Sequence, residues 1–96
     1  MSRIRIEGVT TVSKELIARG VVNAVKGRLM AIKEEIQAID KDMELLHKKY
    51  DLDDEEFLLK FGNGDLGDDE DFFLWESSLK LKKALVDEQA ALSEAL

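Results

Sequence analysis

The chain has 96 residues, of which 36% are charged, contains neither proline nor cysteine, and carries a formal net charge of −7. This length fits one domain, and the lack of cysteine excludes a disulfide framework and thiolate metal sites. No apolar run approaches the roughly 20 residues that a membrane-spanning helix requires, and charged residues near the N-terminus exclude a signal-peptide core. Without proline, and rich in Glu, Lys, Leu and Ala, the chain is expected to be all-α, soluble and cytoplasmic, with no membrane partner.

Residues 3–9 alternate polar and apolar side chains, which predicts a short β-strand or extended arm within residues 1–12. A lone strand leaves its backbone groups unpaired. Three alternatives therefore stay open: the arm pairs with a second copy, pairs with a partner protein, or remains a frayed terminus.

A paired strand followed by helices invites comparison with ribbon-helix-helix DNA binders, in which strand residues enter the major groove. Two features weigh against this alternative. Glu7 falls on the would-be reading face, and a first helix ending near Arg19 is short for that fold. A DNA-binding regulator is the least favoured function, and a nucleic acid partner is not expected.

A long helix is predicted over residues 13–50, because hydroxyl side chains before Lys14 offer N-cap oxygens and the pattern that follows is helical. Gly20 and Gly27 lie inside it, and each costs up to about 1 kcal/mol relative to alanine. A break at Gly20 stays open, whereas Gly27 is expected to be tolerated.

An uninterrupted heptad repeat occupies this helix, with apolar residues separated by alternating gaps of three and four. The repeat continues to Tyr50, which occupies the last position a of the heptad, whose positions are labelled a to g. Such a repeat predicts a coiled-coil-like seam that packs one face on another helix and the remainder on a second copy, with an antiparallel orientation favoured by the charges. The predicted oligomer seam comprises Val22, Val25, Leu29, Ile32, Ile36, Ile39, Met43 and Leu46.

Two shorter helices are predicted after Tyr50. Acidic residues from Asp51 onward indicate a turn and then a helix over residues 53–61, which Gly62-Asn63-Gly64 ends. A C-terminal helix follows over residues 69–95. Residues 1–96 are thus expected to form one helical domain, a long antiparallel hairpin whose two helices cannot bury both apolar faces and therefore form a homodimer or higher oligomer.

Candidate chemistry is sparse. Asp65, Asp69 and Glu76 have the 1, 5 and 12 spacing of an EF-hand loop, but Gly67 and Glu70 stand where that loop needs an oxygen ligand and a glycine. His47 is the only histidine, so an ordinary exposed side chain is expected. No catalytic, cofactor-binding or metal-binding residue is predicted, and the chain is not expected to be an enzyme.

The charge is concentrated in residues 51–76, which hold eleven acidic residues against Lys60 alone, while residues 1–50 have a net charge of +3. Such a segment repels nucleic acid and attracts a basic protein. Phe57, Phe61 and Trp75 are expected to close the core, but four consecutive apolar residues after Asp71 cannot all face inward. The candidate partner-binding residues are Asp65, Asp68, Asp69, Asp71, Phe72, Phe73 and Trp75.

The same segment resembles small prokaryotic antitoxin-like proteins of toxin–antitoxin systems over about residues 50–75. The motifs are Tyr50-Asp51-Leu52, Glu55-Glu56-Phe57, Lys60-Phe61, Gly64-Asp65-Leu66-Gly67-Asp68-Asp69 and Asp71-Phe72-Phe73-Leu74-Trp75. The resemblance implies a non-catalytic protein that neutralises a basic partner such as a toxin, often a ribonuclease with a basic cleft. The N-terminal half departs from the usual antitoxin DNA-binding domains. The alternative function is a structural coiled coil, or a scaffold or chaperone-like helical hairpin oligomer.

Overall fold

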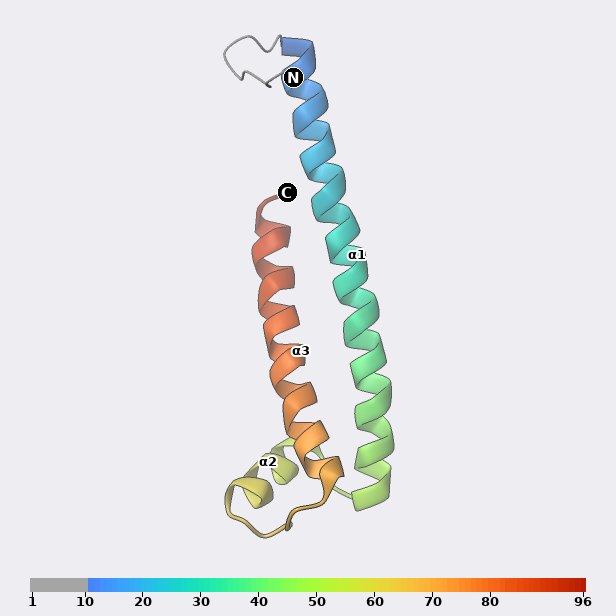
Figure 1. Cartoon of the computed structure of the whole chain (residues 1–96), viewed down its shortest axis with the longest axis vertical. Coiled ribbons are helices and arrows are strands. Elements are labelled where there is room, and N and C mark those ends of the chain that lie inside the picture. The colour runs from blue at the N-terminus through green and yellow to red at the C-terminus, as the bar shows by residue number, and fades with distance from the viewer. Residues whose placement is uncertain (1–10) are drawn as a thin grey trace, which may run out of the picture.

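The computed structural model describes the backbone of residues 11–96 and the side chains of residues 13–96. It contains α1 (Thr11–Tyr50), α2 (Asp54–Gly62) and α3 (Glu70–Glu94), and no strand occurs within this part of the chain. The all-α prediction is confirmed. α1 and α3 lie side by side and antiparallel, and the short α2 closes the end where the chain turns (Figure 1).

The helix bounds differ from the predicted bounds by one or two residues. α1 begins at Thr11, so the predicted arm over residues 1–12 is wrong for its last two residues, which are helical. The rest of that arm, and the strand predicted over residues 3–9, lie outside the described residues. α1 runs through Gly20 without a break.

The turns follow from local side-chain chemistry. Asp51 ends α1 with φ 53°, a left-handed conformation that aspartate tolerates better than most residues. Asp53 caps α2 by accepting the Glu56 N–H at 2.8 Å, and Asp69 caps α3 by accepting the Asp71 N–H at 2.8 Å. Both carboxylates stand at helix N-termini, where the helix dipole favours negative charge.

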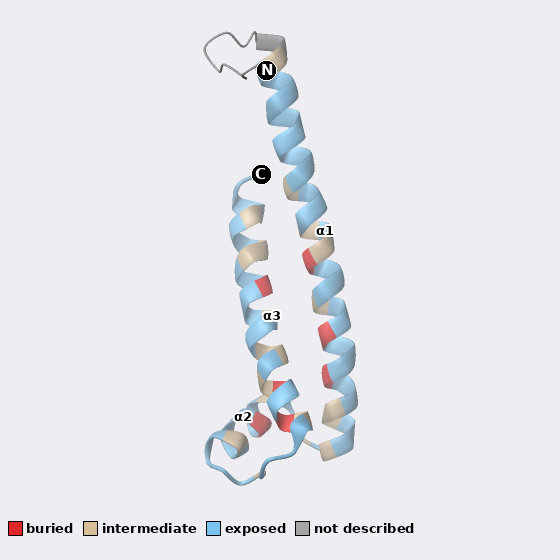
Figure 2. Cartoon of the chain, in the orientation of Figure 1, coloured by how far each residue is buried: buried red, intermediate tan, exposed pale blue. Residues whose placement is uncertain are grey.

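The core is a narrow stripe between α1 and α3 that widens into an aromatic cluster at the turn (Figure 2). Much of the predicted seam faces α3 of the same chain: Ile32, Ile39 and Met43 are buried, and Ile36 and Leu46 are half-buried. Further along the same seam, Val22 is exposed. The core is completed by Phe57, Phe72, Trp75 and Leu85.

α1 extends well beyond the C-terminal end of α3, and the described chain measures 64 × 23 × 22 Å (Figure 1). Near the end of their overlap, Arg28 forms a bidentate ion pair with Glu88, at 2.7 and 2.9 Å. We call residues 13–27 the overhang. Leu16, Ile17 and Val21 are each more than half exposed in this stretch, whereas Val25, near the C-terminal end of α3, is half-buried.

The overhang is a poor helix by itself. Gly20 and Gly27 each cost up to about 1 kcal/mol relative to alanine, and Val21, Val22 and Val25 cost about 0.5 kcal/mol each. Isolated helices of about 15 residues are marginal in water even when their sequences are rich in alanine. This part of α1 therefore needs tertiary or quaternary contacts to remain fully helical.

Candidate protein-interaction surfaces

An aromatic cluster organises the turn end of the molecule. The rings of Phe57 and Trp75 stack with centroids 4.1 Å apart and an interplanar angle of 4°, and both side chains are fully buried. Tyr50 and Phe61 pack around Phe72 at centroid distances of 4.8 and 6.3 Å. These contacts hold α2 against α3 and the start of α3 against the end of α1.

Asp54 links two of the aromatic side chains. Its Oδ1 atom accepts a hydrogen bond from the Trp75 indole N–H at 2.9 Å and lies 2.6 Å from His47 Nε2. Partial burial by itself raises the pKa of Asp54, but the bonds from His47 and Trp75 outweigh it and hold that pKa below its usual value. His47 is half-buried, so the expectation of an ordinary exposed side chain was wrong.

Asp71 forms a second anchor. Its Oδ2 atom accepts hydrogen bonds from Lys49 Nζ at 2.6 Å and from the Tyr50 hydroxyl at 2.5 Å. These two donors lower the pKa of Asp71, while the same contacts raise the pKa of Lys49 and of Tyr50. Asp71 was predicted to bind a partner, and the structure uses it to fasten the start of α3 to the end of α1.

The predicted partner-binding residues fall into two groups. Phe72 and Trp75 are buried at 5% and 0% exposure, because they belong to the aromatic cluster, and a partner cannot reach their side chains in this conformation. Phe73 is 52% exposed and meets Phe61 edge-on. Asp65 and Asp68 are exposed on the loop before α3, next to Asp69, which caps that helix.

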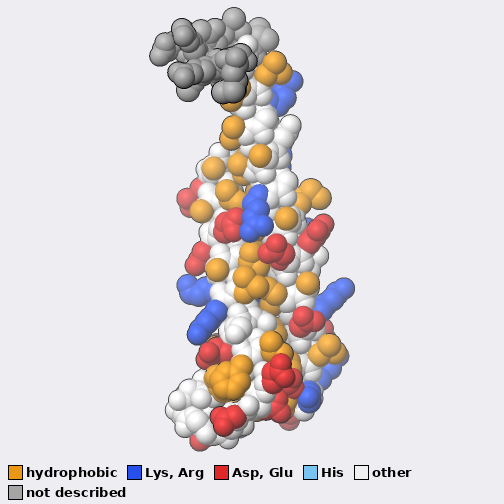
Figure 3. Space-filling model, in the orientation of Figure 1, with side chains coloured by type: hydrophobic (Ala, Val, Ile, Leu, Met, Phe, Trp, Pro, Cys, Tyr) orange, Lys and Arg blue, Asp and Glu red, His pale blue; other side chains and the backbone are white. Residues whose placement is uncertain are grey.

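We call residues 51–76 the acidic tip. Within the described residues, six of its carboxylates have no ion pair or hydrogen bond to their side chains: Asp51, Glu55, Glu56, Asp65, Asp68 and Glu70. Acidic side chains lie beside hydrophobic ones at this end of the molecule (Figure 3). The exposed apolar side chains of the tip are Leu58, Leu59, Phe73 and Leu74.

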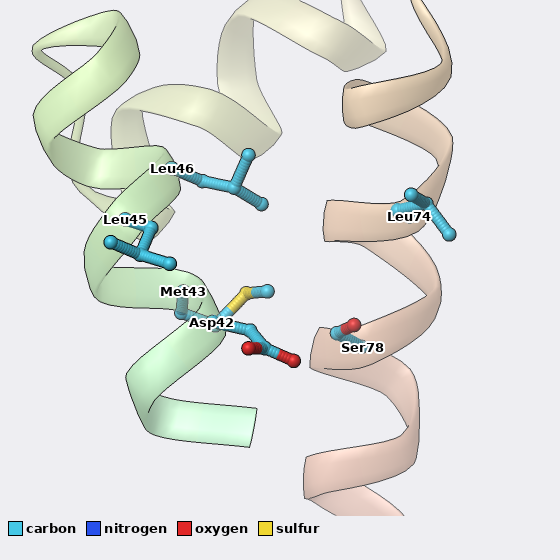
Figure 4. A pocket seen from close by; sticks show the side chains of 6 residues that line it. All are labelled: Asp42, Met43, Leu45, Leu46, Leu74 and Ser78. Atoms are coloured by element: carbon cyan, nitrogen blue, oxygen red, sulfur yellow. The ribbon is translucent and has the colours of Figure 1, made fainter. Parts of the chain in front are cut away.

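A shallow groove lies between α1 and α3 near the tip (Figure 4). Its volume is about 270 Å³. Leu45 and Leu74 on its rim are 67% and 54% exposed. The groove is lined by Asp42, Met43, Leu45, Leu46, Leu74 and Ser78. It is thus largely apolar and carries one carboxylate.

Residues 11–96 contain no cluster of three or more His, Asp or Glu side chains that would hold a metal ion, and none of their helices is long and apolar enough to cross a bilayer. Comparisons with protein-family models, curated proteins and solved structures found no match.

The described surface offers three features for recognition: the carboxylates of the acidic tip, the groove beside them, and the overhang at the other end.

The bonds of His47 and Asp71 were not foreseen. Each joins residues from different helices across a turn, and no spacing rule in the sequence pairs His47 with Asp54 or Tyr50 with Asp71. The only signal was the number of carboxylates near the turn, which exceeds what helix capping needs.

Proposed function

We propose that this chain is a non-catalytic, antitoxin-like interaction protein that binds and neutralises a basic protein partner through the acidic tip. The observation that carries the proposal is the set of six tip carboxylates without a cation or donor from the described chain. Charges of one sign gathered in this way repel one another, and a cationic partner relieves that repulsion. The same field speeds the encounter with such a partner.

The tip also supplies an apolar anchor. Phe73 is 52% exposed, and its ring contacts that of Phe61 of α2 edge-on. Aromatic side chains are enriched among the residues that dominate binding energy, and carboxylates form strong hydrogen bonds with Arg and Lys. We infer a contact in which Phe73 inserts and the surrounding carboxylates pair with basic side chains.

The test is co-expression of the tagged chain with the product of the neighbouring gene, and copurification of a small basic protein is the expected result. The triple variant Asp65→Asn, Asp68→Asn, Glu70→Gln should weaken copurification and neutralisation by at least about tenfold. The matched control is Glu15→Gln, Glu34→Gln, Glu94→Gln, which changes the charge equally at exposed positions outside the tip. Equal binding by the wild type and the triple tip variant would overturn the proposal.

A structural role as a helical oligomer is the second candidate, and the exposed apolar side chains of the overhang favour it. The same co-expression separates the two functions. A scaffold would self-associate and copurify with no basic protein. An antitoxin-like protein would copurify with a basic protein, and the amount retained would fall as the salt concentration rises.

A further inference from the structure

α1 has a second heptad seam beside the one that faces α3. Its positions again alternate in gaps of four and three, and the residues are Ile17, Val21, Ala24, Arg28, Ala31, Glu35, Ala38, Asp42 and Leu45. At 100° per residue this stripe lies roughly a quarter-turn around the helix from the first seam. It therefore points beside α3 rather than at it.

The second seam is open to solvent in the single chain. Ile17, Val21 and Leu45 are 55%, 59% and 67% exposed, and Ala24 and Ala38 are also exposed, whereas Ala31 is half-buried. Six of the nine positions between Ile17 and Leu45 are apolar, and a largely apolar stripe at helical spacing is typical of a helix–helix contact. Small residues at its centre permit two helix axes to come close together.

The order of side chains along this seam is nearly the same from either end. Ala31 stands at the centre, Ala24 and Ala38 lie seven residues to each side, and Ile17 and Leu45 lie at the two ends. Ala31 also lies at the middle of α1 (Thr11–Tyr50). A twofold axis through this point would place Ile17 opposite Leu45 and Ala24 opposite Ala38. Such matching of similar side chains is the property that an isologous dimer needs. Val21 is the exception, because it would face Lys41 and Asp42.

The charges follow the same symmetry. Antiparallel pairing about Ala31 brings Arg28 of one chain beside Glu35 of the other, and it brings Arg19 near Asp42. Arg28 already reaches Glu35 and Glu88 of its own chain, at 3.6 and 2.7 Å, so its guanidinium lies on this side of the molecule. The overhang as a whole is basic, with Lys14, Arg19 and Lys26 against Glu15.

The groove and the overhang are brought together by this pairing. The groove contains Leu45 at one end of the second seam, and Ile17 of the overhang stands at the other end. The lining of the groove includes Leu45, Leu74 and Asp42 (Figure 4). In an antiparallel pair each overhang would therefore lie along the groove of the other copy. The exposed apolar side chains of the overhang and those of the groove rim are covered in one step.

We propose that the second seam is a homodimer interface in which two α1 helices pair antiparallel about Ala31, each overhang occupying the groove of the second copy. The symmetric order of the five positions at seven-residue spacing from Ile17 to Leu45, together with the pairing of Arg28 with Glu35, favours a second copy of this chain over a different partner. Each end of the dimer is then a bundle of three helices, formed by α1 and α3 of one copy and the overhang of the other. This interface is separate from the carboxylates and Phe73 proposed to bind a basic partner.

Disulfide trapping tests the pairing directly, because the chain has no cysteine of its own. In the variant Ile17→Cys, Leu45→Cys the two thiols lie about 42 Å apart within one helix, so a bond between them joins two chains. Mild oxidation should convert most of this variant to a covalent dimer on a non-reducing gel. Ala31→Cys alone should also cross-link, because it lies on the axis.

Three controls accompany it. Ile17→Cys alone and Leu45→Cys alone should remain mostly monomeric on the gel, because equivalent residues lie at opposite ends of the dimer. Leu59→Cys places a thiol at a position on α2 that is 67% exposed and lies outside the second seam. Its cross-linking measures how many covalent dimers form by random collision. Cross-linking of Ile17→Cys alone at the level of the double variant would overturn the antiparallel pairing.

A steric variant tests the interface without a covalent bond. Ala38→Trp places a large ring on the second seam, and Ala90→Trp places the same ring on an exposed position of α3. Sedimentation of the wild type should give twice the chain mass of 10.9 kDa. Ala38→Trp should raise the dimer Kd more than tenfold and Ala90→Trp should leave it unchanged, with circular dichroism confirming that both remain helical. A wild type that sediments as a monomer up to 100 μM, or an Ala38→Trp variant that dimerises normally, would overturn the proposal.

Discussion

Asp54 is the residue on which the shape of the tip most depends. Its carboxylate is the acceptor for the indole N–H of a fully buried tryptophan and also contacts His47, so one side chain ties α1, α2 and α3 together. Within the described residues no buried side-chain nitrogen or oxygen lacks a hydrogen-bond partner. Removing this acceptor would create such an atom at the centre of the cluster.

The variant Asp54→Ala is therefore expected to lower the free energy of unfolding by about 1 to 3 kcal/mol, the cost of leaving a buried donor unsatisfied. Urea unfolding followed by the fluorescence of Trp75, the only tryptophan, measures the change. Asp68→Ala is the control, because this carboxylate is exposed and makes no contact within the described chain; its effect should stay within about 0.5 kcal/mol. Equal effects would contradict the role given to Asp54.

The contribution of Asp71 should depend on pH. Bonds from Lys49 and Tyr50 hold its pKa below the usual value, so the folded state binds fewer protons than the unfolded state near pH 4. The stabilisation is complete above about pH 3.9, the ordinary aspartate pKa, and is lost as the pH falls through the lowered pKa.

Comparison with Asp71→Asn isolates this contribution from the repulsion among the other tip carboxylates. The wild type should be the more stable of the two at neutral pH, and the difference should shrink as the pH falls from about 4 to about 2. Urea unfolding across that range is the measurement. A difference that stays constant with pH would show that the charge of Asp71 is not what stabilises the turn.

At the scale of elements, α1 is a single helix that serves two different neighbours. Its first seam packs on α3 through Ile32, Ile39 and Met43, while its N-terminal third extends past the end of that partner. The two glycines inside it, Gly20 and Gly27, lie outside both seams, and a Cβ added at either would meet no atom within 4 Å. They weaken the helix without filling a steric need.

Gly27→Ala should therefore raise the free energy of unfolding by up to about 1 kcal/mol, because alanine loses less conformational freedom on folding. Gly64→Ala should lower it by about 1 to 2 kcal/mol, since Gly64 has φ 77° in the loop before α3, a left-handed conformation that costs any residue with a Cβ. Thermal unfolding by circular dichroism compares the pair. A loss of stability in Gly27→Ala would indicate a close neighbour at that face of α1.

At the scale of the whole molecule, the chain is a rod with little core. Its radius of gyration is 20.8 Å, whereas a compact domain of this length has about 12 to 13 Å. Because few side chains are buried relative to the large exposed surface, a single chain is only weakly stabilised. The overhang is the least stabilised part of it. A second copy along α1 would shorten the exposed helix and enlarge the core.

Helix content and Tm should consequently rise with protein concentration, because association stabilises the folded state by mass action. Circular dichroism melts over a hundredfold range of concentration should show this for the wild type. Ala38→Trp should remove most of the dependence, and Ala90→Trp should retain it. A wild-type Tm that does not change with concentration would contradict a dimer linked to folding.

The helices and their approximate ends follow from local features of the amino-acid sequence. Heptad spacing, capping aspartates and the glycines after Phe61 act within a few residues, so an all-α chain with three helices could be derived from local rules. The expectation that one of the residues from Phe72 to Trp75 must face outward has the same origin, and Phe73 and Leu74 are exposed.

The contacts that the side chains of those helices make depend on tertiary packing. That packing joined His47 to Asp54 and Tyr50 to Asp71, buried Phe72 and Trp75 away from any partner, and assigned much of the first seam to α3 of the same chain. These contacts form across turns between residues from different helices. They depend on how far α3 reaches along α1 and on the direction in which α2 folds back, and no periodicity within a single helix encodes either quantity.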